Sequence, residues 1–123
     1  MASNLKILIV EPNTQLLHPY MLFPAQWKTL RENTVESALA TVRSFEPDLV
    51  CISTSFALTK SVRLLEALKN LSVHKLIPVV FVIDFSHRVS HIPGTTWGGK
   101  IGIIHSLSSK KELDSTISRV LQP

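Results

Sequence analysis

Hydroxyl and carboxyl side chains stand directly after three apolar runs of this sequence, and their oxygen atoms are the groups that could do chemistry. Ser53, Thr54 and Ser55 follow one run, while Glu11 and Asp84 follow two others. The carboxyl ends of parallel strands meet at one edge of a sheet, where ligands and reacting groups gather. These oxygens could therefore converge on a ligand, or they could cap strand ends and satisfy loop backbone, which is the interpretation we favour.

Two histidines, His87 and His91, have the i, i+4 spacing of metal ligands on a helix. Metal binding also needs an actual helix and a third ligand, and Pro93-Gly94 follow too closely for a long helix. We expect solvated loop histidines and no metal site.

A nucleophilic set could be assembled on paper from Ser53, His105 and Asp84, but nothing in their spacing supports it. The single cysteine, Cys51, excludes an internal disulfide and lies in a predicted core strand, where a thiol packs as a small apolar group. No glycine-rich phosphate loop follows a strand. We therefore expect neither enzyme activity nor a cofactor.

These side chains must be positioned by strands and helices that alternate along the chain. Apolar runs predict strands over residues 5–10, 27–31, 47–54, 77–83 and 100–104, and helical spacing predicts helices over 33–45, 61–71 and 109–121. The unbroken run at 49–52 is typical of a central strand buried on both faces. Right-handed crossovers then give an α/β fold, a doubly wound five-stranded parallel sheet with helices on both faces.

Prolines and glycines limit two of the expected helices. Pro19 and Pro24 interrupt the segment after the first strand, which predicts a short first helix. Pro93-Gly94 and Gly98-Gly99 leave the fourth helix short or replaced by a loop. The capping-box-like sequence Asn33-Thr34-Val35-Glu36 opens one predicted helix, with Glu36 as the acidic partner, and the capping box Ser109-Lys110-Lys111-Glu112 opens the last helix.

The bulk composition fits one domain over residues 1–123. No apolar run approaches the roughly 20 residues that span a bilayer, and the first residues lack the pattern of a signal peptide, so we expect a cytoplasmic protein that contacts no membrane. The net charge of +4 comes from 13 basic and 9 acidic residues scattered along the chain. Direct nucleic-acid binding is not expected, because a binding face would concentrate its charge.

The pattern resembles the receiver domain of two-component response regulators, which is flavodoxin-like with strand order 2-1-3-4-5. The resemblance covers nearly the whole chain and rests on Ile7-Leu8-Ile9-Val10-Glu11-Pro12-Asn13, Pro47-Asp48-Leu49-Val50, Leu64-Leu65 and Ile77-Pro78-Val79-Val80. It implies the transfer of a phosphoryl group to an aspartate after the third strand, assisted by Mg²⁺ that is held by acids after the first strand.

By this resemblance the chain lacks four features of that chemistry. Ser53 stands at the phospho-acceptor position, and a hydroxyl cannot form an acyl phosphate. Pro12 replaces the second acid after the first strand, which leaves Glu11 and Asp84 as a residual acidic cluster and no expected metal. The switch hydroxyl and the lysine-proline pair are replaced by Ile83 and, depending on register, by His105-Ser106 or Ser106-Leu107.

These losses predict a pseudo-receiver, a regulatory domain that works without aspartyl phosphorylation and acts through protein–protein contact. The partner would be a regulatory or output protein, or a second copy of the chain. Phe85, Ile92 and Trp97 lie where no regular amphipathic helix can form, so they either present an interaction surface or pack onto the sheet. The alternative function is a receiver-like switch that responds to a small ligand or to Ser/Thr modification near Ser53.

Overall fold

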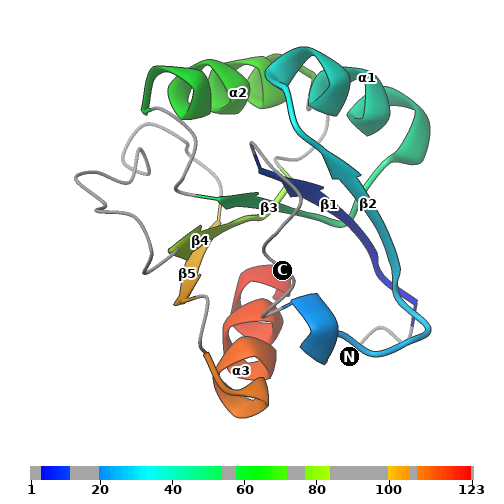
Figure 1. Cartoon of the computed structure of the whole chain (residues 1–123), viewed down its shortest axis with the longest axis vertical. Helices are drawn as coiled ribbons and strands as arrows, with labels where there is room; N and C mark the ends of the chain where they lie inside the picture. Colours follow the sequence, from blue (N-terminus) through cyan, green and yellow to red (C-terminus); the bar gives the residue numbers. More distant parts are fainter. Residues whose placement is uncertain are drawn as a thin grey trace.

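The computed structural model describes residues 4–11, 20–53, 58–71, 77–83, 100–105 and 108–122. These residues form one five-stranded sheet, with β1 at Lys6–Val10, β2 at Lys28–Glu32, β3 at Leu49–Ser53, β4 at Val79–Ile83 and β5 at Ile101–His105. Neighbouring strands are parallel and the order is β2-β1-β3-β4-β5 (Figure 1). The predicted flavodoxin-like order is confirmed.

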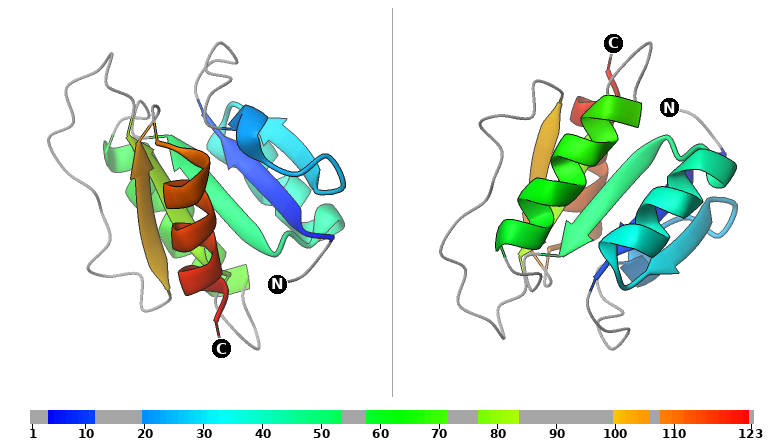
Figure 2. Two further views of the ribbon diagram at one scale, coloured as in Figure 1. Left: turned by 90° about the horizontal axis from the view of Figure 1, so that it is seen from below. Right: turned by 90° about the horizontal axis from the view of Figure 1, so that it is seen from above.

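Helices cover both faces of the sheet. Helices α1 at Val35–Phe45 and α2 at Leu58–Leu71 lie on one face (Figure 2). Helix α3 at Lys110–Leu121 and the 3-10 helix η1 at Tyr20–Leu22 lie on the other. Each face has its own apolar core, which is what a doubly wound sheet requires.

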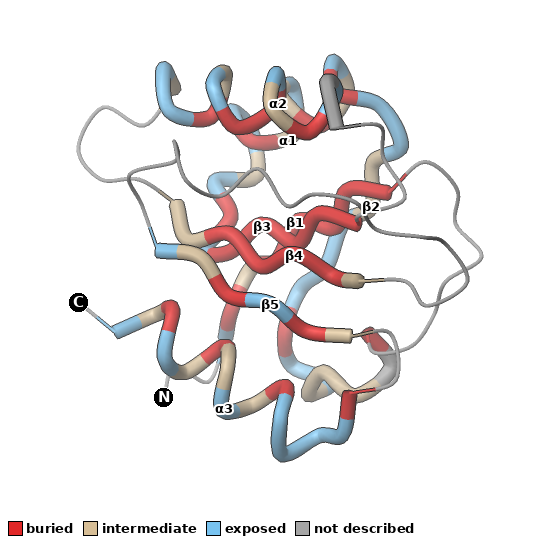
Figure 3. Tube along the Cα trace, turned by 90° about the vertical axis from the view of Figure 1, so that its left-hand side faces the viewer, coloured by how far each residue is buried: buried red, intermediate tan, exposed pale blue. Residues whose placement is uncertain are grey.

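The three central strands carry the buried backbone of the fold. All five residues of β3 are buried, as the unbroken apolar run predicts, and β1 and β4 are buried in four of five positions (Figure 3). The edge strand β2 is exposed in its first three residues, and β5 alternates between buried and more exposed positions. The expected edge position of the second strand is confirmed.

Some element boundaries differ from the predicted ones. Strands β2 and β5 lie one residue later than predicted, β4 begins at Val79, and α2 begins at Leu58 instead of Ser61. In the described part of the segment expected to hold a short first helix, the chain forms the 3-10 turn η1. The expected loss of the fourth helix concerns residues 84–99, which lie outside the described residues.

Capping groups fix the ends of two helices. The hydroxyl of Thr34 accepts a hydrogen bond from the N–H of Ser37 at 3.0 Å, so the partner at the start of α1 is Ser37 and not the predicted Glu36. Helix α1 ends at Phe45, and its C-cap Glu46 lies in the left-handed region with φ of 52°, one residue before the proline that prevents the helix from continuing. The predicted capping box of α3 is confirmed. No helix in the described ranges is long and apolar enough to span a membrane.

Candidate functional site

Glu11 and Ser53 lie at neighbouring strand ends. Ile9 pairs with Cys51 in the β1–β3 register, and both belong to the core on the α3 face. Side chains alternate between the two faces along a strand, so Glu11 and Ser53, each two residues beyond the Ile9–Cys51 pair, lie on this same face. Both residues are 1% exposed, so a carboxyl and a hydroxyl group from neighbouring strand ends lie buried on one face of the sheet.

Arg31 of β2 binds the carboxylate of Glu11. Its guanidinium donates a hydrogen bond to Glu11 Oε1 and forms an ion pair with it. The side chain of Glu11 is 2% exposed and that of Arg31 is 27% exposed, so the pair closes the site from the solvent side. A buried carboxylate needs a cation or several donors, and Arg31 supplies the cation.

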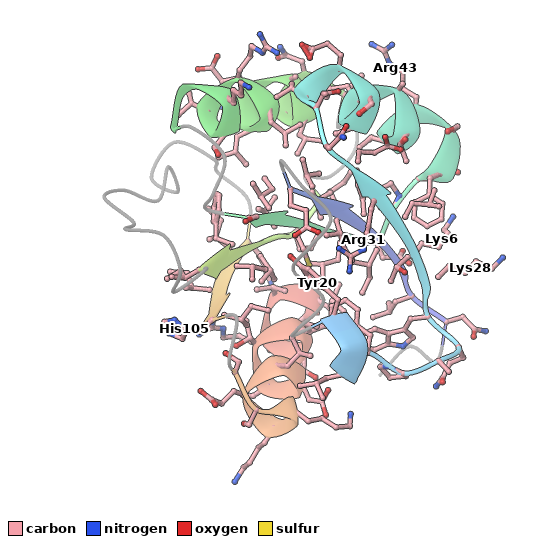
Figure 4. The ribbon with its side chains drawn as sticks, viewed as in Figure 1. Lys6, Tyr20, Lys28, Arg31, Arg43 and His105 are labelled. Carbon is pink, nitrogen blue, oxygen red and sulfur yellow. The ribbon has the colours of Figure 1, made fainter. Side chains whose placement is uncertain are left out.

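Tyr20 packs against the other side of this ion pair. The guanidinium of Arg31 lies over the Tyr20 ring at 5.0 Å from its centroid, a cation–π arrangement (Figure 4). The ring stands in an aromatic row, with Phe23 5.9 Å from Tyr20 and Trp27 5.3 Å from Phe23, measured between centroids. The turn η1 therefore holds Arg31 on the α3 face, where Glu11 meets it.

Sequence reasoning missed Arg31 and Tyr20. A usable signal was present in β2, because Arg31 falls opposite Ile9 once the two strands are paired in parallel. Tyr20 gave no such signal, since its position depends on the irregular chain before β2. We call Glu11, Arg31, Tyr20 and Ser53 the strand-end site.

Burial controls the chemistry of the two nucleophilic atoms near this site. Desolvation, and then the charge of Glu11, raises the pKa of the Cys51 thiol to about 12, so this cysteine stays protonated in the core as expected. Ser53 pairs with Val82 of β4 and is 1% exposed, so a kinase cannot reach it in this conformation. Thr54 and Ser55 lie outside the described residues.

Of the remaining predicted site residues, the structure describes Ile83 and His105, which lie apart from this cluster. Ile83 and His105 pair with each other at the ends of β4 and β5. Strand β4 separates β3 from β5, so roughly 10 Å of sheet lies between the backbones of Ser53 and His105. Ser53 and His105 are therefore not brought together as a pair. The other predicted site residues lie outside the described residues: Asp84, Ser106, Phe85, Ile92 and Trp97.

No protein-family model matches the sequence, and a comparison with curated proteins finds no match. Solved structures do match. The N-terminal domain of a response regulator/sensory box/GGDEF three-domain protein from Carboxydothermus hydrogenoformans is 21% identical, with 94% of this chain and 93% of that chain covered and a TM-score of 0.67. The chemotaxis protein CheY4 of Vibrio cholerae is 17% identical, with 96% and 99% covered and a TM-score of 0.74.

A putative response regulator from Chloroflexus aurantiacus is also similar, at 18% identity with 97% and 98% of the chains covered and a TM-score of 0.71. Further matching structures are receiver domains. The fold is that of a response-regulator receiver domain. At these identities the likeness establishes the receiver fold, and what the strand-end site can do must follow from its own residues.

The described residues of this receiver fold do not fit the Mg²⁺ ion that the resemblance implies. The carboxylate of Glu11 is already bound by a guanidinium, and the neighbouring group is the neutral hydroxyl of Ser53. Mg²⁺ in phosphoryl-transfer sites is held by carboxylates together with phosphate oxygens. Among the residues that the structure describes, no group of three or more His, Cys, Asp or Glu could hold a metal ion.

Proposed function

We propose that the chain is a pseudo-receiver, a non-enzymatic regulatory domain that signals through protein–protein contact and without aspartyl phosphorylation. The observation that carries the proposal is the ion pair between Arg31 and Glu11. A guanidinium in contact with the carboxylate supplies the positive charge that a bound metal would otherwise supply. A domain arranged in this way keeps a neutralised strand-end site at all times.

Two further residues support the proposal. Ser53 ends β3 at the position where the resemblance places the phospho-accepting aspartate, and its buried hydroxyl can form no acyl phosphate. Ile83 ends β4 where a switch hydroxyl is expected, and its side chain has no group that could bond a phosphoryl oxygen. Both the phosphoryl-accepting group and the hydroxyl that responds to the phosphoryl group would be missing, which leaves the outer surface of the domain to carry its function.

The test is to record amide NMR spectra of the full chain with beryllofluoride and Mg²⁺, and again with a small-molecule phosphoryl donor. A receiver domain with intact acids serves as the positive control in the same buffer. We expect the control to show shifts around its aspartate and this chain to show none around Glu11 and Ser53. Shifts localised to those residues that saturate at low millimolar Mg²⁺ would overturn the proposal.

A further inference from the structure

The edge strand β2 has a self-complementary sequence. Its five residues read Lys28-Thr29-Leu30-Arg31-Glu32. Two copies of β2 can be placed side by side and antiparallel, with Leu30 of one copy opposite Leu30 of the other. Lys28 of each copy then lies opposite Glu32 of the second copy, and Thr29 lies opposite Arg31. Both ends of the strand then carry opposite charges face to face, which is the favourable cross-strand arrangement.

The backbone directions of β2 agree with this register. The N–H of Lys28 donates to the carbonyl of Leu5 at 2.8 Å, and the carbonyl of Glu32 accepts from the N–H of Glu11 at 3.1 Å. Lys28, Leu30 and Glu32 thus direct their main-chain groups toward β1. Alternation directs those of Thr29 and Arg31 toward the outer edge. An antiparallel partner needs hydrogen-bonded pairs at alternate positions, and Thr29 opposite Arg31 provides two such pairs around the two-fold axis.

The side chains of the proposed contact lie on one face of the sheet. Leu8, the β1 partner of Leu30, belongs to the core on the α1 face, so Lys28, Leu30 and Glu32 point to that face as well. Leu30 is 44% exposed, one of two large apolar residues that stand out in this way among the described residues. Thr41 of α1 donates a hydrogen bond to Glu32 Oε2 at 2.6 Å and holds the carboxylate on this side.

In the described part of the chain no strand lies beyond β2, which forms one edge of the sheet (Figure 2). An open edge strand is a template for pairing with another chain, and proteins protect such strands with charge. Here Lys28 and Glu32 would repel a strand that places like charges opposite them, but they are complementary to the same residues of a second copy. The pattern therefore favours a second copy of the chain as the partner.

From this combination we infer that two copies of the chain associate through an antiparallel β2–β2 pair, which joins their sheets into one ten-stranded sheet about a two-fold axis. The inference rests on the proposed function in one respect, since it names a second copy of the chain as the protein partner of the pseudo-receiver. The association itself is independent of the strand-end site, because its test measures molecular mass and the earlier test measures a response to beryllofluoride. A five-residue strand pair is a small contact, so the dimer dissociates on dilution.

The test is sedimentation equilibrium of the full chain over about a hundred-fold range of concentration, with Lys28→Glu, Glu32→Lys and their equimolar mixture. In a dimer of either variant both cross-strand charge pairs become like-charged, so we expect association at least about tenfold weaker than in the unsubstituted chain. In a mixed dimer of the two variants every cross-strand charge pair is again opposite in sign, so we expect the equimolar mixture to associate again. Circular dichroism confirms that each variant folds.

A second pair of variants tests the backbone of the contact. Thr29→Pro removes an N–H that points outward and so breaks no bond to β1, whereas Thr29→Ala keeps that N–H. We expect the proline variant to lose dimerisation and the alanine variant to retain it. A monomer at every concentration overturns the inference, and so does a dimer that Lys28→Glu, Glu32→Lys and Thr29→Pro all leave as tight as before.

Discussion

The guanidinium of Arg31 donates a hydrogen bond to the carboxylate of Glu11, which joins the edge strand β2 to the chain leaving β1. The main chain makes a parallel link, because the N–H of Glu11 donates to the carbonyl of Glu32 at 3.1 Å. Glu11 is thus fixed by backbone and side chain to the same strand. The receiver fold is thus combined with a buried carboxylate whose charge is balanced by Arg31.

Replacement of Arg31 by Met should destabilise the fold. The Glu11 side chain is 2% exposed and its carboxylate would lose its cation, while Met keeps much of the apolar length that packs on Tyr20. We expect the free energy of unfolding to fall by about 1–3 kcal/mol, less than for a fully buried pair because Arg31 is partly exposed. Urea denaturation at neutral pH measures the change.

The double variant Glu11→Gln with Arg31→Met separates the ion pair from general packing. Once the carboxylate is neutral, loss of the guanidinium no longer leaves a buried charge, so the two substitutions together should cost less than their sum. Strictly additive costs would mean that the two side chains do not depend on one another.

Substitution of Ser53 by Asp tests whether the site can be returned to metal chemistry. The new carboxylate would stand beside Glu11 at a position that is 1% exposed, so we expect the free energy of unfolding to fall by about 2 kcal/mol or more at neutral pH. Mg²⁺ should restore none of this lost stability, because the neighbouring carboxylate of Glu11 is already paired with Arg31. Thermal unfolding with and without Mg²⁺ measures this.

Ser53→Asn is the matched control, since it has nearly the shape of the aspartate and no charge. It should be less destabilised, and equally so with and without the metal. A clear rise in the melting temperature of Ser53→Asp alone on adding Mg²⁺ would show that the strand-end site accepts the ion despite Arg31.

The sequence predicted which strands form the centre of the sheet, whereas the strand boundaries differ by one or two residues in the centre and at the edges alike. Strand β3 is buried on both faces, so its residues must be apolar without interruption, and that run is readable directly. Strands β2 and β5 are partly exposed, and each was predicted one residue early because polar side chains there carry no boundary signal. The partnership of Arg31 with Glu11 can be predicted only once β1 and β2 are paired in the right register, because the two residues are about twenty positions apart in the chain.

Gly102 is a further residue whose role was hidden in the sequence. It lies in β5 beneath α3, and a Cβ added there would come within 2.7 Å of Thr116 Cγ2 and 2.9 Å of Val120 Cγ1. Only a residue without a side chain lets the helix approach this closely. The predicted strand contained Gly102 as an ordinary member, since the contact exists only once α3 has packed.

Gly102→Ala should therefore destabilise the chain by about 1–3 kcal/mol, as overpacking does in a well-filled core. Both close atoms belong to branched side chains of α3, so the helix must move or change rotamers. Urea denaturation gives the cost. Addition of Thr116→Ser removes the nearer of the two methyl groups, and the double variant should lose less than the sum of the single ones. Full additivity would place the strain elsewhere.

The capping box of α3 should make the folding stability of the chain depend on pH in the acidic range. The N–H of Ser109 donates to the carboxylate of Glu112 at 3.0 Å, and this backbone hydrogen bond is the main reason that the pKa of Glu112 lies below its ordinary value. The folded state therefore binds this proton less readily than the unfolded state. The stabilisation is present above the unfolded pKa and is lost as the pH falls through the folded one, from about pH 5 downward.

Glu112→Gln keeps an acceptor for the Ser109 N–H but removes the charge, so it should be less stable than the unsubstituted chain at pH 7 and equal to it at low pH. Ser109→Ala removes the hydroxyl that accepts from the N–H of Glu112 at 3.2 Å and should cost about 1 kcal/mol. Urea denaturation of the three proteins between about pH 3 and 7 measures the convergence. A gap between Glu112→Gln and the unsubstituted chain that stays constant over this range would show that the charge of Glu112 does not stabilise the helix.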